Sequence, residues 1–398
     1  MKNTACPSIF LLSVRAAIWA LIVMNPAGAV DVSAPRARDL GIRFDGEPGP
    51  LNAITDVAGV HVGHATLVAS PDPRSEVRTG VTAILPRGKE SANLPVYAGW
   101  FSLNGNGEMT GTAWVDESGM LEGPVMLTNT HSVGVVRDAV IAWRIRAGHA
   151  DASGYWWSLP VVAETWDGYL NDINGFHVRA EDADMALFNA RSGPIAEGNV
   201  GGGTGMICHE FKCGIGTASR RVKIADEPYV LGALVQANYG IRDTLRIAGV
   251  PVGTHLRQQR VYTDPALADD TGSIIVVIAT DAPLLPHQLK RLARRVTMGL
   301  ARNGSYAGNG SGDLFIAFST ANAAASLNQS GRGSASFLGN DALNPLFIAT
   351  IEATEEAIVN SMIAARDMRG QDGHQVLAIP HDELRKVLRN YGRIRQGR

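Results

Sequence analysis

Residues 308–313 read Gly-Asn-Gly-Ser-Gly-Asp and lead directly into residues 314–318, which read Leu-Phe-Ile-Ala-Phe. The second run is short and apolar and follows an aspartate, which predicts a buried strand. A glycine before Ser311 allows backbone conformations in which the serine hydroxyl can reach the carbonyl behind it, and the strand would hold that oxygen in place. From spacing alone, a glycine-rich turn ahead of an ordinary strand is the commoner explanation.

The chemistry that this stretch permits is an acyl shift from nitrogen to oxygen. Ser311 would attack the carbonyl of Gly310, and hydrolysis of the resulting ester would leave Ser311 with a free α-amine. An α-amine has a pKa of about 8, so it can act as a general base near neutral pH. One residue would then supply both nucleophile and base, and no histidine would be needed.

Outside this stretch, short β-rich runs are mixed with helical segments. Because they do not follow a strict βαβ order, they predict an α+β or layered α/β/β/α architecture. The expected strands are residues 57–62, 81–85, 125–130, 230–236, 274–279 and 314–318. The expected helices are residues 135–147, 286–300, a segment from Asn344-Pro345 to about Arg366, and residues 381–389.

Composition narrows the class of partner. The 398 residues include 36 Lys plus Arg against 38 Asp plus Glu, without a basic stripe, so a small-molecule substrate is expected and nucleic acid is not. The glycine clusters do not complete a dinucleotide fingerprint, because Met206 and Asp313 stand where the third glycine is required. No His-Glu-x-x-His motif or phosphate loop occurs, so neither a cofactor nor a metal is expected.

The first residues predict export. Lys2 precedes an apolar stretch that ends at Pro26-Ala27-Gly28-Ala29, a pattern typical of a secretory signal spanning residues 1–29. We therefore expect a periplasmic or extracellular protein that is not held in a membrane after the signal is removed, since no other apolar run is long enough to cross one.

Two cysteines, Cys208 and Cys213, remain after the signal is removed. In an oxidising compartment they could form a local disulfide, although geometry could equally forbid it, and buried free thiols are the default. A zinc site that includes His209 would lack the second half of the usual ligand spacing.

Five runs in one order carry a family resemblance. They are residues 104–111 (Asn-Gly-Asn-Gly-Glu-Met-Thr-Gly), 164–172 (Glu-Thr-Trp-Asp-Gly-Tyr-Leu-Asn-Asp), 235–240 (Val-Gln-Ala-Asn-Tyr-Gly), 310–313 (Gly-Ser-Gly-Asp) and 352–356 (Glu-Ala-Thr-Glu-Glu). From roughly Gly41 to Ala365 the chain resembles the L-aminopeptidase/D-amino-acid esterase-amidase and β-peptidyl aminopeptidase family of self-cleaving N-terminal-serine hydrolases. The resemblance implies a four-layer αββα fold and cleavage between Gly310 and Ser311. Residues 30–310 would then stay bound to residues 311–398 within one catalytic domain.

The resemblance also assigns roles to residues. Ser311 would be the nucleophile, and the side-chain amide of Asn238 would donate to the oxyanion, which needs a neutral, preorganised donor. Glu164 would hold the free ammonium group of the substrate, so that a blocked N-terminus leaves a buried carboxylate unpaired. Tyr169 would donate a hydrogen bond at the reacting centre. Without the resemblance, each of these three residues has an ordinary structural explanation. Asn238 would be a turn residue at a strand end, Glu164 an exposed carboxylate at a strand end, and Tyr169 a core residue.

Glu352, assisted by the hydroxyl of Thr350, would orient or tune the new amine. If both residues lie inside a regular helix, their side chains point to nearly opposite faces. They converge only if the helix begins later than Pro345 indicates.

The function that follows is an aminopeptidase that releases N-terminal amino acids from small peptides, amides or esters, as a homo-oligomer of cleaved heterodimers, a tetramer by resemblance. Two alternatives remain. One is an acyltransferase like the ornithine acetyltransferases, although Ser311 and the export signal argue against it. The other is a secreted binding protein in which the glycine loops only shape a ligand cleft.

Overall fold

A computed structural model describes residues 34–72, 74–148, 156–258, 260–261, 272–323 and 331–394, all within the unit Val32–Arg398. The expected signal segment, residues 1–29, lies outside these residues. In the part of the chain that the structure describes, no helix is long and apolar enough to cross a bilayer.

A six-stranded sheet forms the centre of the unit, in the order β4-β3-β12-β11-β10-β9. Its strands are β3 (Val96–Gly105), β4 (Met120–Leu121), β9 (Ile215–Ile224), β10 (Glu227–Asn238), β11 (Ser273–Thr280) and β12 (Gly312–Ser319). The two middle strands, β11 and β12, run parallel, and every residue in them is buried. Strands covered on both faces are expected to be apolar throughout, as these two nearly are.

A second sheet has four strands in the order β1-β2-β5-β6. They are β1 (His61–Asp72), β2 (Ser75–Lys89), β5 (Val125–Asn129) and β6 (Val161–Thr165). One apolar cluster contains side chains of both sheets, including Ile275 and Leu314 from the first and Ile84 and Leu127 from the second. The two sheets therefore pack face to face, with alternate residues of each strand filling the space between them.

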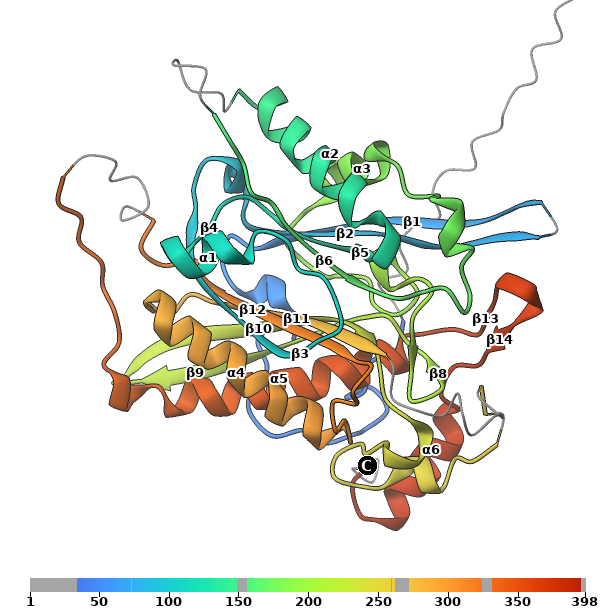
Figure 1. Cartoon of the computed structure of the whole chain (residues 1–398). Helices are drawn as coiled ribbons and strands as arrows, with labels where there is room; N and C mark the ends of the chain where they lie inside the picture. The colour runs from blue at the N-terminus through green and yellow to red at the C-terminus, as the bar shows by residue number, and fades with distance from the viewer. Residues whose placement is uncertain are drawn as a thin grey trace, which may run out of the picture. The chain divides into compact units, whose positions relative to one another are not determined.

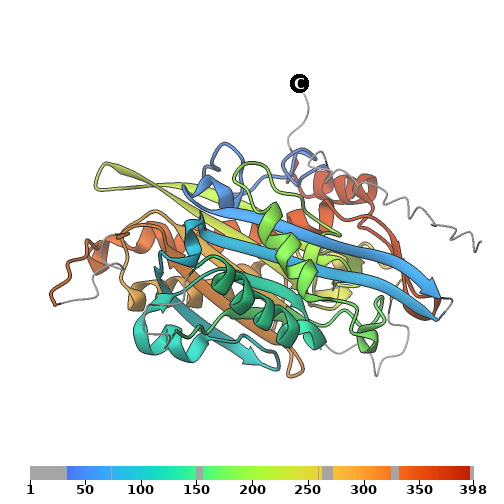
Figure 2. The same ribbon diagram turned by 90° about the horizontal axis from the view of Figure 1, so that it is seen from above.

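Helices cover the two outer faces (Figure 1). On the four-stranded sheet lie α2 (Val133–Arg146) and α3 (Ala180–Asn189), and Figure 2 shows both lying across its strands. The six-stranded sheet is covered by α4 (Pro286–Arg302) and α5 (Asn344–Ile363). The layers are thus helix, sheet, sheet and helix, which confirms the expected αββα fold.

Helix α4 shows how the sequence sets this packing. It begins at Pro286, whose fixed φ and missing N–H suit the first helical position, and Leu289, Leu292 and Val296 form a fully buried stripe. A Cβ added to Gly99 of β3 would lie 2.7 Å from the carbonyl oxygen of Pro286. Only a glycine lets the helix approach the strand this closely.

The remaining elements are short. They are α1 (Thr112–Ser118), α6 (His381–Asn390), and two small hairpins, β7 (Ile207–Cys208) with β8 (Phe211–Lys212) and β13 (Met368–Arg369) with β14 (Gln375–Val376). The β7–β8 hairpin is closed by a disulfide between Cys208 and Cys213, with an S–S distance of 2.07 Å. This settles the question that the sequence left open for these two cysteines.

One expected strand is largely wrong. Residues 57–60 are not in a strand, and β1 begins only at His61. The chain before it makes a single turn over Ile54–Asp56, and the carboxylate of Asp56 accepts the N–H groups of Leu51 and Ala53. Because Val57 and Val60 are fully buried, their apolar pattern indicates burial and not membership of a strand.

Candidate active site

Four strands of the six-stranded sheet place the candidate residues at one end. Asn238, the last residue of β10, pairs with Ser273 of β11, and Ser273 pairs with Gly312 of β12. Gly312 in turn pairs with Gly105 at the end of β3. Ser311 directly precedes β12. The expected nucleophile and the expected oxyanion donor therefore lie at the same end of the sheet, at β12 and β10, with β11 between these two strands.

Ser311 is held tightly in the intact chain. Its exposed fraction is only 1%, and its N–H donates to the carbonyl of Gly308 at 2.9 Å, closing a turn. Its hydroxyl donates to Oδ1 of Asp313 at 2.8 Å. The N–H of Gly312 donates to the hydroxyl oxygen of Ser273 at 3.2 Å. Both the backbone and the hydroxyl of the expected nucleophile are thus fixed before any reaction.

The end of β3 holds the loop that precedes Ser311. The side-chain amide of Asn104 donates to the carbonyls of Ala307 and Gly308. The amide of Asn106 donates to the carbonyl oxygen of Gly310 at 2.7 Å. The last contact is made to the carbonyl group of the bond that the sequence predicts to be cut. Sequence reasoning assigned no role to Asn106, although the residue stands inside one of the matching runs.

Glu164, the residue before the last one of β6, carries a buried carboxylate, with an exposed fraction of 3%. One oxygen accepts the N–H of Glu108 at 2.9 Å, and the other accepts the hydroxyl of Thr130. Burial raises the pKa of the Glu164 carboxyl, and the two hydrogen bonds oppose that shift. The ionised form is costly here without a counter-charge, so the site favours a bound cation.

Glu164 also lies close to Ser311. A Cβ added to Gly107 would be 3.3 Å from both Oε1 of Glu164 and the Cα of Gly312, so the two flank the same point of the chain. A Cβ on Gly312 would lie 2.4 Å from the carbonyl oxygen of Asn106, which explains why the residue after the serine must be glycine. The ammonium-binding and nucleophilic positions of the hypothesis are therefore neighbours.

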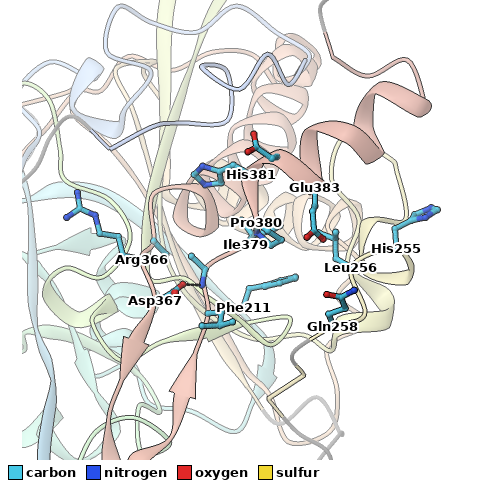
Figure 3. Close-up of a pocket in the computed structure, with 14 residues that line it drawn as sticks. Phe211, His255, Leu256, Gln258, Arg366, Asp367, Ile379, Pro380, His381 and Glu383 are labelled. Atoms are coloured by element: carbon cyan, nitrogen blue, oxygen red, sulfur yellow. Dashed lines mark hydrogen bonds between the residues drawn. The ribbon is translucent and has the colours of Figure 1, made fainter.

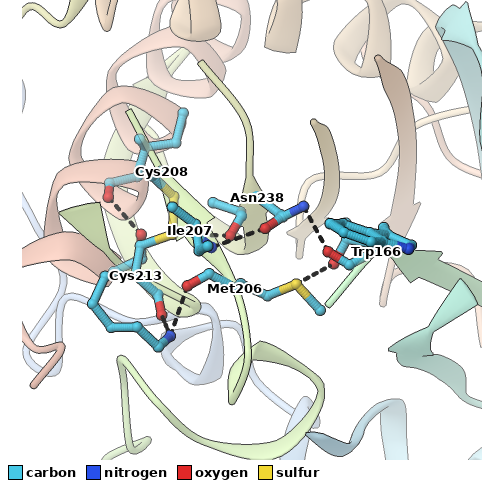
Figure 4. Close-up of a disulfide and its surroundings, with 11 residues drawn as sticks. Trp166, Met206, Ile207, Cys208, Cys213 and Asn238 are labelled. Carbon is cyan, nitrogen blue, oxygen red and sulfur yellow. Dashed lines mark hydrogen bonds between the residues drawn. A yellow bond between two sulfur atoms is a disulfide. The ribbon is translucent and has the colours of Figure 1, made fainter. Parts of the chain in front are cut away.

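Asn238 is oriented by backbone groups (Figure 4). Its Oδ1 accepts the N–H of Ile207 at 2.8 Å, and its Nδ2 donates to the carbonyl of Trp166 at 2.9 Å. An amide nitrogen carries two hydrogens, and among the described residues the structure gives this one a single acceptor. The geometry fits a preorganised donor.

The disulfide braces this donor. Ile207 and Cys208 form β7, and the N–H of the next residue, His209, donates to the carbonyl of Tyr239 at 2.8 Å, immediately after Asn238. The Cys208–Cys213 bond thus closes the hairpin that carries the Ile207 contact.

Removal of this bond should cost stability. We expect replacement of both Cys208 and Cys213 by serine to lower the free energy of unfolding by about 2 kcal/mol, the value for closing so short a loop. Urea unfolding of the double variant and of the oxidised wild type measures the difference. Identical midpoints and slopes would show that hydrogen bonds alone hold the hairpin.

Tyr169 lies in the turn after β6. Its ring stacks on that of His374, with centroids 4.0 Å apart, and Nδ1 of His374 contacts the carbonyl of Tyr169 at 2.9 Å. Partial burial raises the pKa of the Tyr169 hydroxyl, which keeps the group a proton donor.

Thr350 and Glu352 lie inside α5, which begins at Asn344, so the late helix start that would let them converge is absent. The hydroxyl of Thr350 donates to the carbonyl of Leu346 at 2.8 Å, and Glu352 faces Arg220 of β9, with Nε and Oε2 3.4 Å apart. Strand β9 is an edge strand of the six-stranded sheet and lies three positions from β12 in the strand order. In the contacts that the described residues make, neither side chain reaches Ser311.

An open pocket of about 810 Å³ lies between the segment after α5, the start of α6 and the β8 region (Figure 3). Its walls include Phe211, His255, Asp367, His381 and Glu383, and none of the predicted catalytic residues. Within the described ranges, no group of three or more His, Cys, Asp or Glu side chains could hold a metal ion.

Comparison with known proteins agrees with this arrangement. The model of peptidase family S58 matches residues 52–376. The chain belongs to peptidase family S58. It is 52% identical over 382 residues to the β-peptidyl aminopeptidase BapA of Sphingosinicella microcystinivorans, covering 92% of this chain and 95% of that one.

Solved structures add the fold. The L-aminopeptidase D-Ala-esterase/amidase of Ochrobactrum anthropi, a prototype for the serine aminopeptidases and a variant of the Ntn hydrolase fold, superposes with a TM-score of 0.85. It is 51% identical, over 91% of this chain and all of that one. A Burkholderia sp. β-aminopeptidase gives a TM-score of 0.81 at 49% identity, over 90% and 99%. The S58 chain is a peptide hydrolase of the serine aminopeptidase type, and neither the acyltransferase nor the binding-protein alternative gains support.

Proposed function

We propose that this S58 chain cuts its own backbone between Gly310 and Ser311, and that Ser311 then removes N-terminal amino acids from small peptides or amides. The aminopeptidase activity is supported most by one observation, the buried carboxylate of Glu164 close to Gly312, the residue that follows Ser311. A carboxylate in that position pairs with a free ammonium group, which only the first residue of a substrate carries.

The proposed reaction divides tasks among three groups. The α-amine of Ser311 takes the proton of its own hydroxyl as the oxygen attacks the substrate carbonyl. The amide of Asn238 donates to the oxyanion that develops. Glu164 holds the ammonium group and thereby places the first peptide bond, and no other, at the nucleophile. Thr350 and Glu352 have no part in this scheme, because their contacts direct them to α5 and β9.

The test of self-cleavage is direct. After removal of residues 1–29, the purified protein should give two bands on a denaturing gel, of about 30 and about 9 kDa, since 398 residues weigh 42.2 kDa and the cut leaves 281 residues (30–310) in the larger piece and 88 (398 − 310) in the smaller one. N-terminal sequencing of the small band should begin Ser-Gly-Asp-Leu. A single band in an active preparation would overturn the proposal.

The substrate class rests on the relatives. Two of them are named a β-peptidyl aminopeptidase and a β-aminopeptidase, and one is named an L-aminopeptidase D-Ala-esterase/amidase, so amides of these kinds form the panel to measure. From the signal pattern of residues 1–29 we place the protein outside the cytoplasm, and from the family resemblance we propose a homotetramer of cleaved heterodimers.

Glu164→Gln should show whether the carboxylate reads the free amine. For a free-amine p-nitroanilide, we expect kcat/KM to fall by about 10²-fold, because a buried charged partner is lost. The wild type should not act on the N-acetylated compound. Glu108→Gln is a matched control, since the hydrogen bond from Glu108 to Glu164 comes from the backbone N–H and is kept in that variant. Equal wild-type rates on the free and acetylated compounds would remove Glu164 from this role.

A further inference from the structure

Self-cleavage poses a chemical problem that peptide hydrolysis does not. In the finished enzyme the α-amine of Ser311 is the base, but before the cut that nitrogen is an amide and cannot accept a proton. Its N–H is instead engaged with the carbonyl of Gly308. The first reaction of the chain therefore needs a different base and its own oxyanion donor.

We infer that Asp313 is the base and Asn106 the oxyanion donor of the self-cleavage reaction, two catalytic residues that act on the precursor. This inference rests on the proposed cut between Gly310 and Ser311. The geometry points to these residues because each one contacts a reacting atom. Asp313 receives the hydroxyl of Ser311 at 2.8 Å, and Asn106 donates to the carbonyl oxygen of Gly310 at 2.7 Å.

The surroundings favour Asp313 over the other nearby carboxylate. Both oxygens of Glu164 accept hydrogen bonds from other donors, the N–H of Glu108 and the hydroxyl of Thr130. The hydroxyl of Ser311 is directed to Asp313, which is fully buried in the second position of β12. A carboxylate held 2.8 Å from a hydroxyl meets the distance requirement for a general base.

Asn106 is an exposed residue whose side chain meets the carbonyl of Gly310. It follows the last residue of β3, which pairs with β12, and its backbone packs against Gly312 so closely that no Cβ fits between them. The sheet therefore fixes the backbone that carries this side chain beside the scissile carbonyl. A preorganised amide donor at that oxygen stabilises the negative charge that develops when the carbonyl becomes tetrahedral.

The reaction balances with these groups. The Ser311 oxygen bonds to the Gly310 carbon while Asp313 takes the hydroxyl proton and Asn106 donates to the oxyanion. When the tetrahedral centre collapses, the C–N bond breaks and Asp313 returns the proton to the leaving nitrogen, which gives an ester and a free amine. Water then adds to the ester carbon and the C–O bond breaks. This restores the Ser311 hydroxyl and leaves Gly310 as a carboxylate.

The test follows cleavage of the newly translated full-length chain over time on denaturing gels. We expect Asp313→Asn to slow cleavage by at least about 10²-fold, and Asp313→Glu to recover part of the rate. Asn106→Ala should slow it by about 10²-fold to 10³-fold. Asn104→Ala is the matched control, because Asn104 holds only the carbonyls of Ala307 and Gly308. Its loss should be less than about tenfold, the share expected of loop positioning without oxyanion contact.

A change of nucleophile separates base catalysis from folding. A thiol ionises far more readily than a hydroxyl, so a Ser311→Cys chain depends less on a base. In that background Asp313→Asn should slow cleavage by less than about tenfold. An equal loss in the serine and cysteine chains would overturn the role of Asp313, and so would a wild-type rate in Asp313→Asn. If Asn106→Ala slows cleavage no more than Asn104→Ala does, the proposed role of Asn106 as oxyanion donor is wrong. A wild-type chain that never cleaves would instead refute the proposed function.

Discussion

Ser311→Ala is expected to yield one uncut chain without peptidase activity. Loss of the hydroxyl removes the group that attacks Gly310, so no α-amine forms, and it also removes the nucleophile toward substrates. Loss of a serine nucleophile lowers kcat by about 10⁶-fold in well-studied hydrolases, which here means a rate below detection. Denaturing gels and hydrolysis of a free-amine p-nitroanilide measure the two losses separately.

Ser305→Ala is the matched control for this variant. Ser305 lies in the same loop and its oxygen only accepts the N–H of Ala307, so cleavage and activity should both persist. Thermal unfolding of Ser311→Ala should remain cooperative, because the precursor already has the complete fold. An uncut Ser311→Ala protein that hydrolyses substrate would end the proposal that this serine is the nucleophile.

Asn238→Ala should give the second largest effect. The amide is fixed between Ile207 and Trp166 at the end of β10, and removal of one such oxyanion donor lowers kcat by about 10²-fold to 10³-fold. KM should change little, because the contact strengthens only as the carbonyl becomes tetrahedral. Steady-state kinetics on fully processed protein measures both constants.

Gln236→Ala is the comparison for Asn238→Ala. Gln236 lies on the same face of β10, two residues earlier, and its amide donates to Thr128 and Thr165 across the space between the sheets. Its loss should cost stability and leave kcat within about tenfold, as expected where no oxyanion contact is removed. A similar fall in kcat for both variants would assign Asn238 a packing role.

Much of the fold was predictable because burial leaves a clear periodic pattern. The middle strands and α4 were expected nearly where they lie, since each buries an unbroken apolar run or a single stripe. The strand predicted for residues 57–60 was wrong for the same reason, because buried valines in a loop give the same sequence pattern as a buried strand. The disulfide was open in the sequence, as pairing depends on the separation of two Cα atoms, which is 5.6 Å here.

The candidate site divides in a similar way. Ser311, Glu164 and Asn238 could be named from short matching runs. The structure places Ser311 and Asn238 at one end of the six-stranded sheet, and Glu164 of the other sheet near Gly312. Asp313 and Asn106 stand in those runs as well, but their roles depend on single hydrogen bonds that spacing does not encode. The placement of Thr350 and Glu352 depended on where α5 begins, and a helix boundary is the least certain part of a sequence-based prediction.

The hydrogen bond from Asn106 to the Gly310 carbonyl joins two residues that are 204 positions apart in the sequence. The two meet only when β3 has paired with β12, an arrangement that an unfolded chain does not have. Under the chemistry proposed above, the newly made polypeptide is a zymogen whose activation needs no second protease. Completion of the central sheet is itself the trigger, so a chain that misfolds stays inert and only a correctly assembled one acquires its reactive terminus.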